Sequence, residues 1–355
     1  MPSPDKPSEP YVGAARGVFS AVVTGGTGFV GRALTSALDD AGWPVTVLTR
    51  DPDRARKQLP PAVRAEAWDG RSAGPWERFI DGADAVVNLA GKGIFESRWN
   101  DETMARIAAS RLDAVEILAG AIARAKTRPK VFVGASAVGY YGPRGDEEID
   151  ETGKPGGDFL AGVCARWEEA YRKIEALGVR VVILRIGVVL GPDPGLLTRL
   201  LAPAAMMPVP GLRKATGLLG VNLQAGALPQ MMPPVPLFAL RTVGGGGQWF
   251  SWIHRDDLVG MARWAVENDK VRGVLNATAP EPVTMREFLR VLAAVRGKWR
   301  AIPLFGWQLR LMAGRVAEIL LTGQRVYPKA ATAAGYAFRH PTCEGALRDL
   351  LGRNE

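Results

Sequence analysis

Short apolar runs recur along the chain, and longer segments with apolar residues at helical spacing lie between them. The runs have the length of strands, and their hydrophobicity is continuous, which is typical of parallel strands buried on both faces. They begin at Ala21 and also cover Val45–Leu48, Asp84–Gly91, Lys130–Gly134 and Val179–Ile186. This alternation predicts an α/β fold, a Rossmann-type doubly wound parallel sheet.

Helical periodicity is clearest in residues 101–125, where Ile107, Val115, Leu118 and Ile122 are apolar. Further helices are predicted from Phe29, from Asp158 as an N-cap, over Met285–Val295, over Ile302–Leu321 as one or two helices, and over Glu344–Leu351. We interpret Trp307, Leu311 and Ile319 as core residues of helices that cover a substrate cleft. The expected domains are a disordered leader (1–18), an NAD(P)-binding Rossmann domain (19–300) and a smaller C-terminal substrate-side region (301–352).

A glycine-rich turn lies between the first predicted strand and the helix that begins near Phe29. Gly25, Gly28 and Gly31 have the spacing of a dinucleotide site. Gly25 allows the tight turn, Gly28 lets backbone N–H groups approach a pyrophosphate, and Gly31 lets the helix pack closely on the sheet. Because the pyrophosphate would bind at the helix N-terminus, the predicted cofactor-binding residues also include Thr27, Phe29 and Val30.

The end of the second strand indicates which dinucleotide binds. An NAD site usually has an acidic residue about 20 residues beyond the glycines, where it binds the ribose 2′-hydroxyl. Here Thr49 and Arg50 occupy that place. A guanidinium matches a 2′-phosphate in charge and geometry, so we expect NADP rather than NAD. Asp51 beside it could still bind a hydroxyl, and Arg50 could be an ordinary solvated arginine.

Composition excludes several classes of protein. The net charge is +9, but the basic residues are scattered among acidic ones, so we expect no nucleic-acid partner. The sequence contains no run of about 18 apolar residues, so we expect no membrane span. With only His254 and His340, and two cysteines that form no CxxC pair, we expect no metal site. The Pro- and Ser-rich N-terminus lacks the apolar core of a secretory signal. It is interpreted as a disordered leader or part of a transit peptide, in a protein of the cytoplasm, another soluble reducing compartment or the plastid stroma.

Many sequence blocks occur in one order between about Ala21 and Leu351. They are VTGGTGFVG, VNLAG, SRWN, SRL, SAVGYYG, DFLAGVCARWE, RIGVVLG, QWFSWIHRDDL, LNATAP-x-PVT and GQRVYPK. In these blocks the chain resembles the atypical extended short-chain dehydrogenase/reductases known as epimerase family proteins, subfamily 39U, which are sugar-nucleotide-epimerase-like. The resemblance implies a Rossmann fold that binds NADP, a C-terminal substrate-side region and a poorly defined activity.

The resemblance also raises the question of catalysis, because short-chain dehydrogenases use a serine and a Tyr-x-x-x-Lys pair. None of the six tyrosines has a lysine four residues later. Aligning the chain on Glu168 puts Leu160 in the tyrosine place and Cys164 in the lysine place, whereas Ser136 keeps the serine place. The catalytic candidates are therefore Ser136, Tyr140 and Tyr141.

Each catalytic candidate has a structural alternative. The paired tyrosines could be packing residues with hydroxyls at the surface. Cys164 could lie near the cofactor, but its apolar stripe favours a core position. Glu151 could also approach the cofactor, but its acidic loop favours a solvated side chain.

Other candidates belong to binding. Leu89, Ala90 and Gly91 follow a parallel strand, where ligands meet the sheet. Arg111 resembles the arginine that helps hold the cofactor in the family, although it could be a surface helix residue. Val189 is expected to line the nicotinamide side, and His254 is either a structural histidine bonded to backbone or a substrate contact.

One segment departs from the family. Between Pro192 and Gly244 the chain is longer than its relatives require, and residues 203–233 have no clean period. A structureless insertion in a compact domain is unusual, so we interpret it as a surface loop or as translated intron sequence. The resulting hypothesis is an NADP-dependent oxidoreductase or epimerase of a small substrate, for which a nucleotide sugar is one option. The alternative is a cofactor-sensing or scaffolding protein without turnover, such as a plastid-division or regulatory factor.

Overall fold

A parallel seven-stranded sheet lies at the centre of the molecule. The structure is a computed structural model, and it describes residues 18–95, 99–192, 239–296, 300–304 and 306–352. The strand order is β12-β7-β5-β4-β1-β2-β3, and all neighbours pair in parallel. The strands are β1 (Ala21–Thr24), β2 (Val45–Thr49), β3 (Arg64–Ala67), β4 (Ala85–Asn88), β5 (Val131–Ala137), β7 (Arg180–Ile186) and β12 (Gly273–Ala277). The predicted fold class is confirmed.

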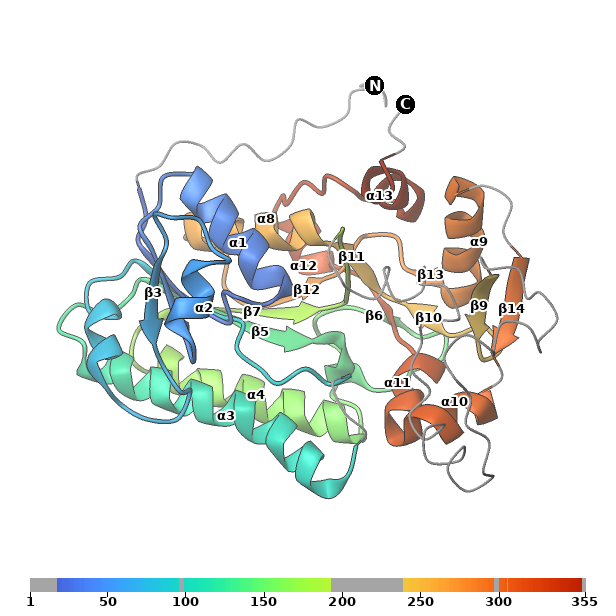
Figure 1. Ribbon diagram of the computed structural model, residues 1–355, viewed down its shortest axis with the longest axis horizontal. Helices are drawn as coiled ribbons and strands as arrows, with labels where there is room; N and C mark the ends of the chain where they lie inside the picture. Colours follow the sequence, from blue (N-terminus) through green and yellow to red (C-terminus); the bar gives the residue numbers. More distant parts are fainter. Residues whose placement is uncertain (1–17, 96–98, 193–238, 297–299, 305, 353–355) are drawn as a thin grey trace, which may run out of the picture.

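Helices cover both faces of the sheet (Figure 1). Helices α1 (Phe29–Asp40) and α8 (Arg255–Glu267) lie on one face, and α3 (Asp101–Arg124) and α4 (Phe159–Glu175) lie on the other. Successive strand residues serve the two faces in turn: Val23 packs in the core with Leu34, whereas Val22 packs in the core with Leu118. Because both faces are buried, these strands are continuous apolar runs rather than alternating ones.

The strand order reverses at β1, which pairs with β2 on one side and with β4 on the other. Crossovers on the two sides of such a point lead to opposite faces of the sheet and leave a crevice at the carboxyl ends of the strands. The ends of β1 and β4 are held in register there, because Thr24 Oγ1 donates a hydrogen bond of 2.6 Å to Asn88 Oδ1. Asn88 Nδ2 in turn donates to the Tyr171 hydroxyl at 3.3 Å. A buried polar network therefore fixes the edge of the sheet that carries the candidate site.

Side-chain caps set the start of the two long helices. Asn100 Oδ1 accepts a hydrogen bond from the backbone N–H of Thr103 at the start of α3. Asp158 Oδ1 accepts one from Ala161 N at the start of α4, as the sequence predicts. Both caps satisfy N–H groups that have no partner within the helix. The chain also forms short helices α2 (Pro52–Arg56) and α12 (Lys329–Ala333) and 3-10 turns at Pro75–Phe79 and Val138–Tyr141.

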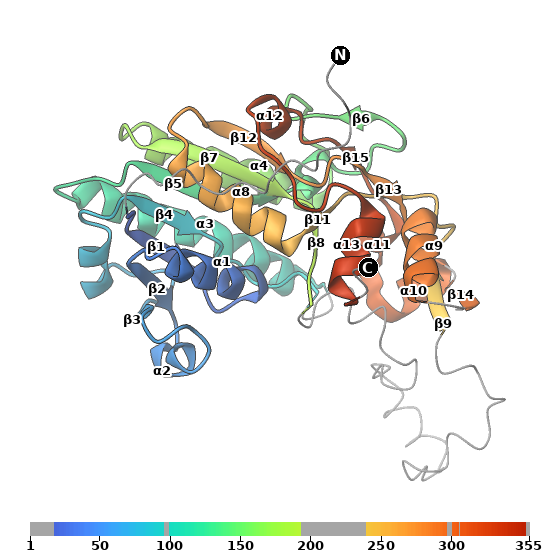
Figure 2. The same ribbon diagram turned by 90° about the horizontal axis from the view of Figure 1, so that it is seen from above.

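The second part of the molecule lies beyond the carboxyl ends of the sheet (Figure 2). Its strands form four pairs: β8 (Val188–Leu190) with β11 (Trp252–His254), β10 (Trp249–Phe250) with β13 (Val283–Thr284), β9 (Ala239–Val243) with β14 (Arg300–Leu304), and β6 (Glu148–Ile149) with β15 (Arg325–Val326). Its helices are α9 (Met285–Arg296), α10 (Gly306–Ala313), α11 (Ala317–Leu321) and α13 (Cys343–Leu350). Phe288, Leu292 and Leu347 belong to the separate core of this part.

Predictions for Ile302–Leu321 need correction. Residues 300–304 form strand β14, and only then do α10, a 3-10 turn at Gly314–Val316 and α11 follow. Proline at 303 and glycines at 306 and 314 interrupt any longer helix. The core assignment of Trp307 and Leu311 is also wrong, since they are 64% and 72% exposed. The predicted insertion at 203–233 and residues 1–17 of the predicted leader lie outside the described residues.

No helix in the described ranges is long and apolar enough to cross a bilayer.

Candidate functional site

The turn between β1 and α1 can be built only with glycine. Gly25 has a φ of +70°, and a Cβ there would lie 2.6 Å from the carbonyl oxygen of Leu89. A Cβ on Gly31 would lie 2.1 Å from the carbonyl oxygen of Gly25. The nearest atoms to Gly31 thus belong to the turn, whereas the sequence predicts that Gly31 packs against the sheet. The neighbouring Gly26, which the prediction omits, meets the sheet, because a Cβ there would lie 2.7 Å from the side chain of Val47.

Helix α1 begins at this turn with no side-chain cap. Gly28 is the N-cap residue, and its own N–H donates to the Gly25 carbonyl at 3.0 Å. The N–H groups of the first helical turn therefore face the crevice with the positive end of the helix dipole. An anion such as a pyrophosphate binds favourably at a helix end of this kind. The structure brings Gly25, Gly28 and Gly31 together as predicted.

The three residues around the start of α1 have different surroundings. The Thr27 carbonyl accepts a hydrogen bond of 3.0 Å from Arg32 Nη1, and Val30 packs at the edge of the core. The Phe29 ring extends to the end of β8, where a Cβ on Gly191 would lie 2.6 Å from it. Val189 lies on the same strand and pairs with Ile253 of β11. Phe29 and Val189 therefore lie beside the same end of the crevice.

The end of β2 presents basic side chains to solvent. Thr49 Oγ1 accepts from Asp51 N at 3.4 Å, and Asp51 Oδ1 accepts from Arg54 N at 3.0 Å as the N-cap of α2. Within the described part of the chain, the guanidinium groups of Arg50 and Arg54 form no hydrogen bond or ion pair. Arg56 differs, because its Nη1 lies 2.6 Å from Asp53 and its Nη2 donates to a backbone carbonyl. One oxygen of Asp51 is therefore used by the helix cap, whereas the guanidinium groups of Arg50 and Arg54 are both available.

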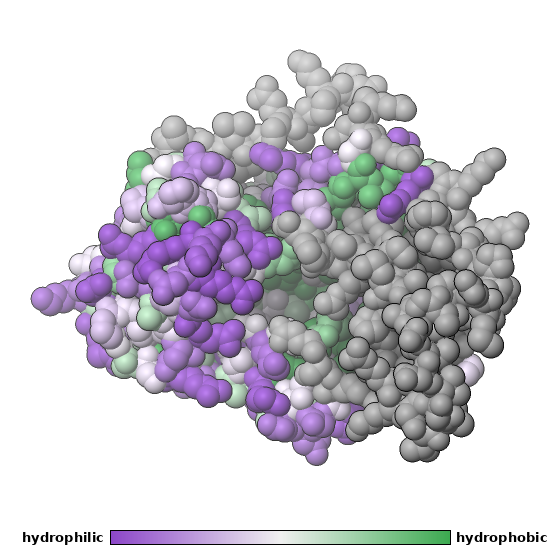
Figure 3. Space-filling view, viewed as in Figure 1, coloured by the Kyte–Doolittle hydropathy of each residue, from purple (hydrophilic) through white to green (hydrophobic). Residues whose placement is uncertain are grey.

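The residues that follow β4 form the opposite wall. The Leu89 carbonyl touches Gly25, and Ala90 N donates to Asn88 Oδ1 at 3.3 Å. Gly91 is exposed and lies against Arg111, since a Cβ on Gly91 would be 3.1 Å from the guanidinium carbon. The predicted residues of β1, α1 and β4 thus meet at one crevice. Figure 3 shows the surface hollowed near the middle of the molecule, with hydrophobic residues visible there.

Arg111 is not a surface arginine. Its Nη1 donates to the carbonyls of Lys92 and Ile107 at 3.1 and 3.0 Å, and its guanidinium lies 5.2 Å from the Trp167 ring centroid. Burial lowers its pKa. The surface alternative is therefore wrong. Arg111 holds the loop after β4 in place, and its cation faces the same wall of the crevice as Gly91.

Ser136, the predicted serine, donates a hydrogen bond to a buried ion pair that the sequence did not predict. Its hydroxyl donates a hydrogen bond of 2.6 Å to Glu168 Oε1. Arg185 donates to both oxygens of Glu168, from Nε at 2.9 Å and from Nη2 at 2.8 Å. Burial alone would lower the pKa of Arg185, but the hydrogen bonds that Arg185 donates to Glu168, together with the negative charge of Glu168, outweigh burial and raise that pKa. Arg185 therefore stays protonated, and its ion pair with Glu168 holds the serine in one orientation.

The two candidate tyrosines differ sharply. The Tyr141 hydroxyl donates to Asn276 Oδ1 at 2.6 Å and accepts from Arg185 Nη1 at 2.8 Å. Tyr141 is fully buried, and burial raises its pKa to about 12. Tyr140 is half-buried, and its ring centroid lies 3.5 Å from the Arg185 guanidinium carbon. Tyr141 is therefore a packing residue, but its hydroxyl is buried and not at the surface as that alternative states, whereas Tyr140 is partly exposed.

The structure also decides between the alternatives for Cys164 and Glu151. Cys164 is buried, and burial raises its pKa to about 11, so the core interpretation is confirmed. The expectation of a solvated Glu151 is wrong, because its two oxygens accept from the backbone N–H groups of Asn276 and Ala330 at 3.0 and 3.1 Å. Glu151 joins β12 to α12 and lies beneath Arg185, which donates to its carbonyl at 3.2 Å.

His254 is a structural histidine, as one of the two predicted alternatives states. It is fully buried, and its Nδ1 accepts a hydrogen bond of 3.1 Å from Asp256 N at the start of α8. It lies away from the Ser136 network, beside the second histidine of the chain.

The crevice at the point of strand reversal, with a glycine turn and an uncapped helix start, defines a dinucleotide-binding Rossmann protein. Residues 21–277 match the model of the NAD dependent epimerase/dehydratase family, and residues 304–350 match a domain of unknown function, DUF1731. The chain therefore belongs to the NAD dependent epimerase/dehydratase family, and the predicted resemblance is confirmed.

Its relatives extend over nearly the whole chain. The epimerase family protein SDR39U1 homolog, chloroplastic, of Arabidopsis thaliana is 36% identical over 93% of this chain and 86% of its own length. The human epimerase family protein SDR39U1 is 34% identical over 93% of this chain and 99% of its own.

Among solved structures, human SDR39U1 (isoform 2) with NADPH has a TM-score of 0.73 at 32% identity and covers 94% of this chain and 100% of its own. A Bacillus cereus UDP-glucuronic acid 4-epimerase with UDP-glucuronic acid and NAD has a TM-score of 0.67 at 17% identity, with 94% of this chain and 98% of its own covered. At that identity it shows the fold alone.

Proposed function

We propose that this protein binds NADP in the crevice between β1 and β4 and is an oxidoreductase of a small carbonyl or alcohol substrate. The glycine turn and the uncapped start of α1 support pyrophosphate binding. The solved human relative contains NADPH. The nicotinamide would supply or accept a hydride, and the residues of the chain would supply binding and proton transfer.

NADP is favoured over NAD by the partners of the charged side chains that follow β2. A 2′-hydroxyl is usually bound by a carboxylate, and one oxygen of Asp51 is already occupied by the cap of α2. A 2′-phosphate needs cations, and the guanidinium groups of Arg50 and Arg54 point to solvent without protein partners among the described residues. Arginine binds phosphate oxygens through paired N–H groups, which makes these two side chains the proposed phosphate site.

Proton transfer is assigned to Tyr140. The other candidates have committed protons, because Ser136 donates to Glu168 and Tyr141 donates to Asn276. The Arg185 cation lies 3.5 Å from the Tyr140 ring centroid. It thus places a fixed positive charge beside the ring that becomes negative when the hydroxyl loses its proton. In this proposal Arg185 takes the place of the lysine that the family has on α4.

Calorimetric titration with NADPH and NADH tests the cofactor assignment. We expect the wild type to prefer NADPH, and Arg50→Ala and Arg54→Ala to lose roughly 10- to 100-fold of NADPH affinity, because each loses hydrogen bonds to a charged group. NADH binding should change little. The matched control is Arg56→Ala on the same helix, whose guanidinium is already paired with Asp53. Equal affinity for both cofactors in the wild type, or an unchanged preference in the double variant, would refute the assignment.

Substrate screening with NADPH oxidation tests turnover. Tyr140→Phe should bind NADPH like the wild type but lose turnover on any substrate that the screen identifies. Turnover that survives in Tyr140→Phe would remove Tyr140 from the mechanism. NADPH binding without turnover across a broad carbonyl panel would instead favour a cofactor-binding protein without catalysis.

We propose that the protein is located in a reducing compartment of the cell. Cys164 and Cys343 are both free and buried, so the fold needs no disulfide. The Arabidopsis relative is named as chloroplastic. Fractionation of cells that express the tagged protein would test this, and recovery from an oxidising compartment would contradict it.

A further inference from the structure

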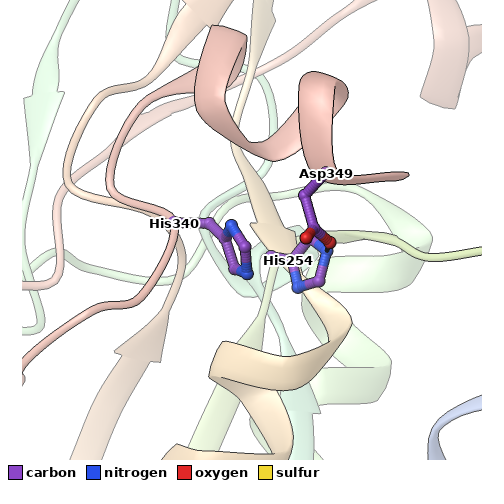
Figure 4. A group of neighbouring side chains, drawn as sticks. All are labelled: His254, His340 and Asp349. Carbon is purple, nitrogen blue, oxygen red and sulfur yellow. Dashed lines mark ion pairs between the residues drawn. The ribbon is translucent and has the colours of Figure 1, made fainter. Parts of the chain in front are cut away.

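Both histidines of the chain meet at one place outside the cofactor crevice. His254 ends β11, His340 lies in the loop before α13, and Asp349 lies in the last turn of α13. The ring centroids of the histidines are 3.9 Å apart, and the candidate ligand atoms of all three residues lie within 4.8 Å of one another. Figure 4 shows the rings facing each other and the Asp349 carboxylate reaching His254 from the helix. The sequence expectation of no metal site rests on the number of histidines and not on their positions.

The inner histidine has a polar atom with no hydrogen-bond partner. His254 is fully buried, and its Nε2 forms no hydrogen bond within the described residues. The nearest carboxylate oxygen, Oδ2 of Asp349, lies 3.4 Å away. That separation exceeds the usual range for an N–H···O hydrogen bond, about 2.7–3.2 Å. It matches the roughly 3.3–3.5 Å between two ligands that share a tetrahedral zinc ion, given metal–ligand distances of about 2.0–2.2 Å.

We propose that His254, His340 and Asp349 form a binding site for a divalent transition metal of the zinc class. Two imidazoles and a carboxylate are a donor set that zinc accepts, and the fourth position would remain for water. His340 and Asp349 are half-buried, so their side chains can close the remaining distance around an ion. The metal would join α13 to the end of β11.

Neighbouring contacts hold the ligands near their places. The buried Asp257 carboxylate accepts hydrogen bonds from the backbone N–H groups of Arg339 and His340, at 2.7 and 3.0 Å. The loop that carries His340 is thereby tied to α8 before any metal binds.

Metal binding has one identifiable cost. Asp256 N donates to His254 Nδ1, so the metal-free imidazole carries its proton on Nε2. A metal on Nε2 requires the proton to move to Nδ1, and the hydrogen bond from Asp256 is then lost. Metal binding therefore changes the tautomer of His254. This change is a spectroscopic signature that a bound ion elsewhere on the surface would not produce.

The test uses the full chain without a polyhistidine tag, after treatment with a chelator. Zn²⁺ affinity is measured by competition with a chromophoric chelator, and Co²⁺ is added as a visible probe. We expect one equivalent of Zn²⁺, tetrahedral Co²⁺ absorption bands, and a shift of the His254 tautomer in long-range proton–nitrogen spectra. His340→Gln and Asp349→Asn should each weaken Zn²⁺ binding at least tenfold.

The control is Glu344→Gln, a carboxylate on the same helix that pairs with Arg348 at the surface and should leave Zn²⁺ affinity unchanged. His340 and Asp349 are half-buried, so circular dichroism can verify that these variants fold. The proposal would be overturned if both variants bound Zn²⁺ as tightly as the wild type, or if the wild type took no Zn²⁺ from the chromophoric chelator. A sulfur-to-cobalt charge-transfer band would also overturn it, because the metal would then lie on a cysteine.

Discussion

Replacing Glu168 by glutamine removes the negative charge from the buried network beside the crevice. Glu168 and Arg185 are only 8% and 3% exposed. The glutamate oxygens accept three hydrogen bonds, of 2.6 Å from Ser136 and of 2.9 and 2.8 Å from Arg185. In the variant, the Arg185 cation stays in the interior without a counter-charge.

The expected cost follows from this burial. Breaking a buried pair by neutralising one partner destabilises a protein by about 3–5 kcal/mol. That is a large share of a total stability of about 5–15 kcal/mol. Arg185 cannot move to solvent to reduce the cost, because Tyr141 and the Glu151 carbonyl also hold its Nη1. We therefore expect a clear fall in the urea midpoint and in Tm.

Urea unfolding followed by circular dichroism measures the change in free energy of unfolding. Glu344→Gln is the control, because its partner Arg348 is at the surface, where an ion pair contributes about 0–1 kcal/mol. A second variant, Glu168→Met with Arg185→Met, removes both charges and should recover part of the loss. A cost below about 1 kcal/mol for Glu168→Gln, or a double variant less stable than the single one, would refute the reasoning.

Three further perturbations test other parts of the structure. Gly31→Ala should destabilise the protein by about 1–3 kcal/mol and weaken NADPH binding, since a Cβ there would lie 2.1 Å from the Gly25 carbonyl oxygen; thermal unfolding and calorimetry measure this. Tyr141→Phe should cost about 1–3 kcal/mol in urea unfolding, because its buried partners lose a hydrogen bond, and an unchanged midpoint would contradict the network. Hydrogen bonds from the Thr152 hydroxyl and then from Lys329 lower the pKa of Asp150 to about 2. The ionised Asp150 therefore contributes to the stability of the fold above about pH 4, and this contribution is lost as the pH falls to about 2. Between these two pH values, Tm should fall less in Asp150→Asn than in the wild type.

The first βαβ unit could be predicted from the sequence because its determinants are local. The apolar run of β1, the glycines of the turn and the periodicity of α1 all lie within residues 21–40. Even there, the role of Gly26 was missed, because its contact with Val47 depends on how the turn meets β2. Local pattern determines which elements form, but close packing between elements depends on their arrangement.

The network behind the candidate site could not be predicted in the same way. Tyr141 and Asn276 are separated by 135 residues, and Glu151 and Ala330 by 179. An acidic residue in a polar loop has the same sequence pattern whether it is solvated or accepts buried N–H groups, so the prediction for Glu151 was wrong. One signal was available for Arg185: a charge within the apolar run Val179–Ile186 must have a buried partner.

The position of that partner bears on the missing Tyr-x-x-x-Lys pair. Glu168 lies one helical turn after Cys164, which occupies the lysine place on α4. A lysine there would add a positive charge to the site, whereas this chain supplies the cation from β7 and adds a carboxylate on α4 to hold it. Because Arg185 is paired with Glu168, the positive charge that it places beside the Tyr140 ring is partly offset, so the pair also serves to orient the groups around it. In the proposed mechanism the reaction depends on the Tyr140 hydroxyl, so Tyr140→Phe should affect turnover more than any loss of charge that leaves the fold intact.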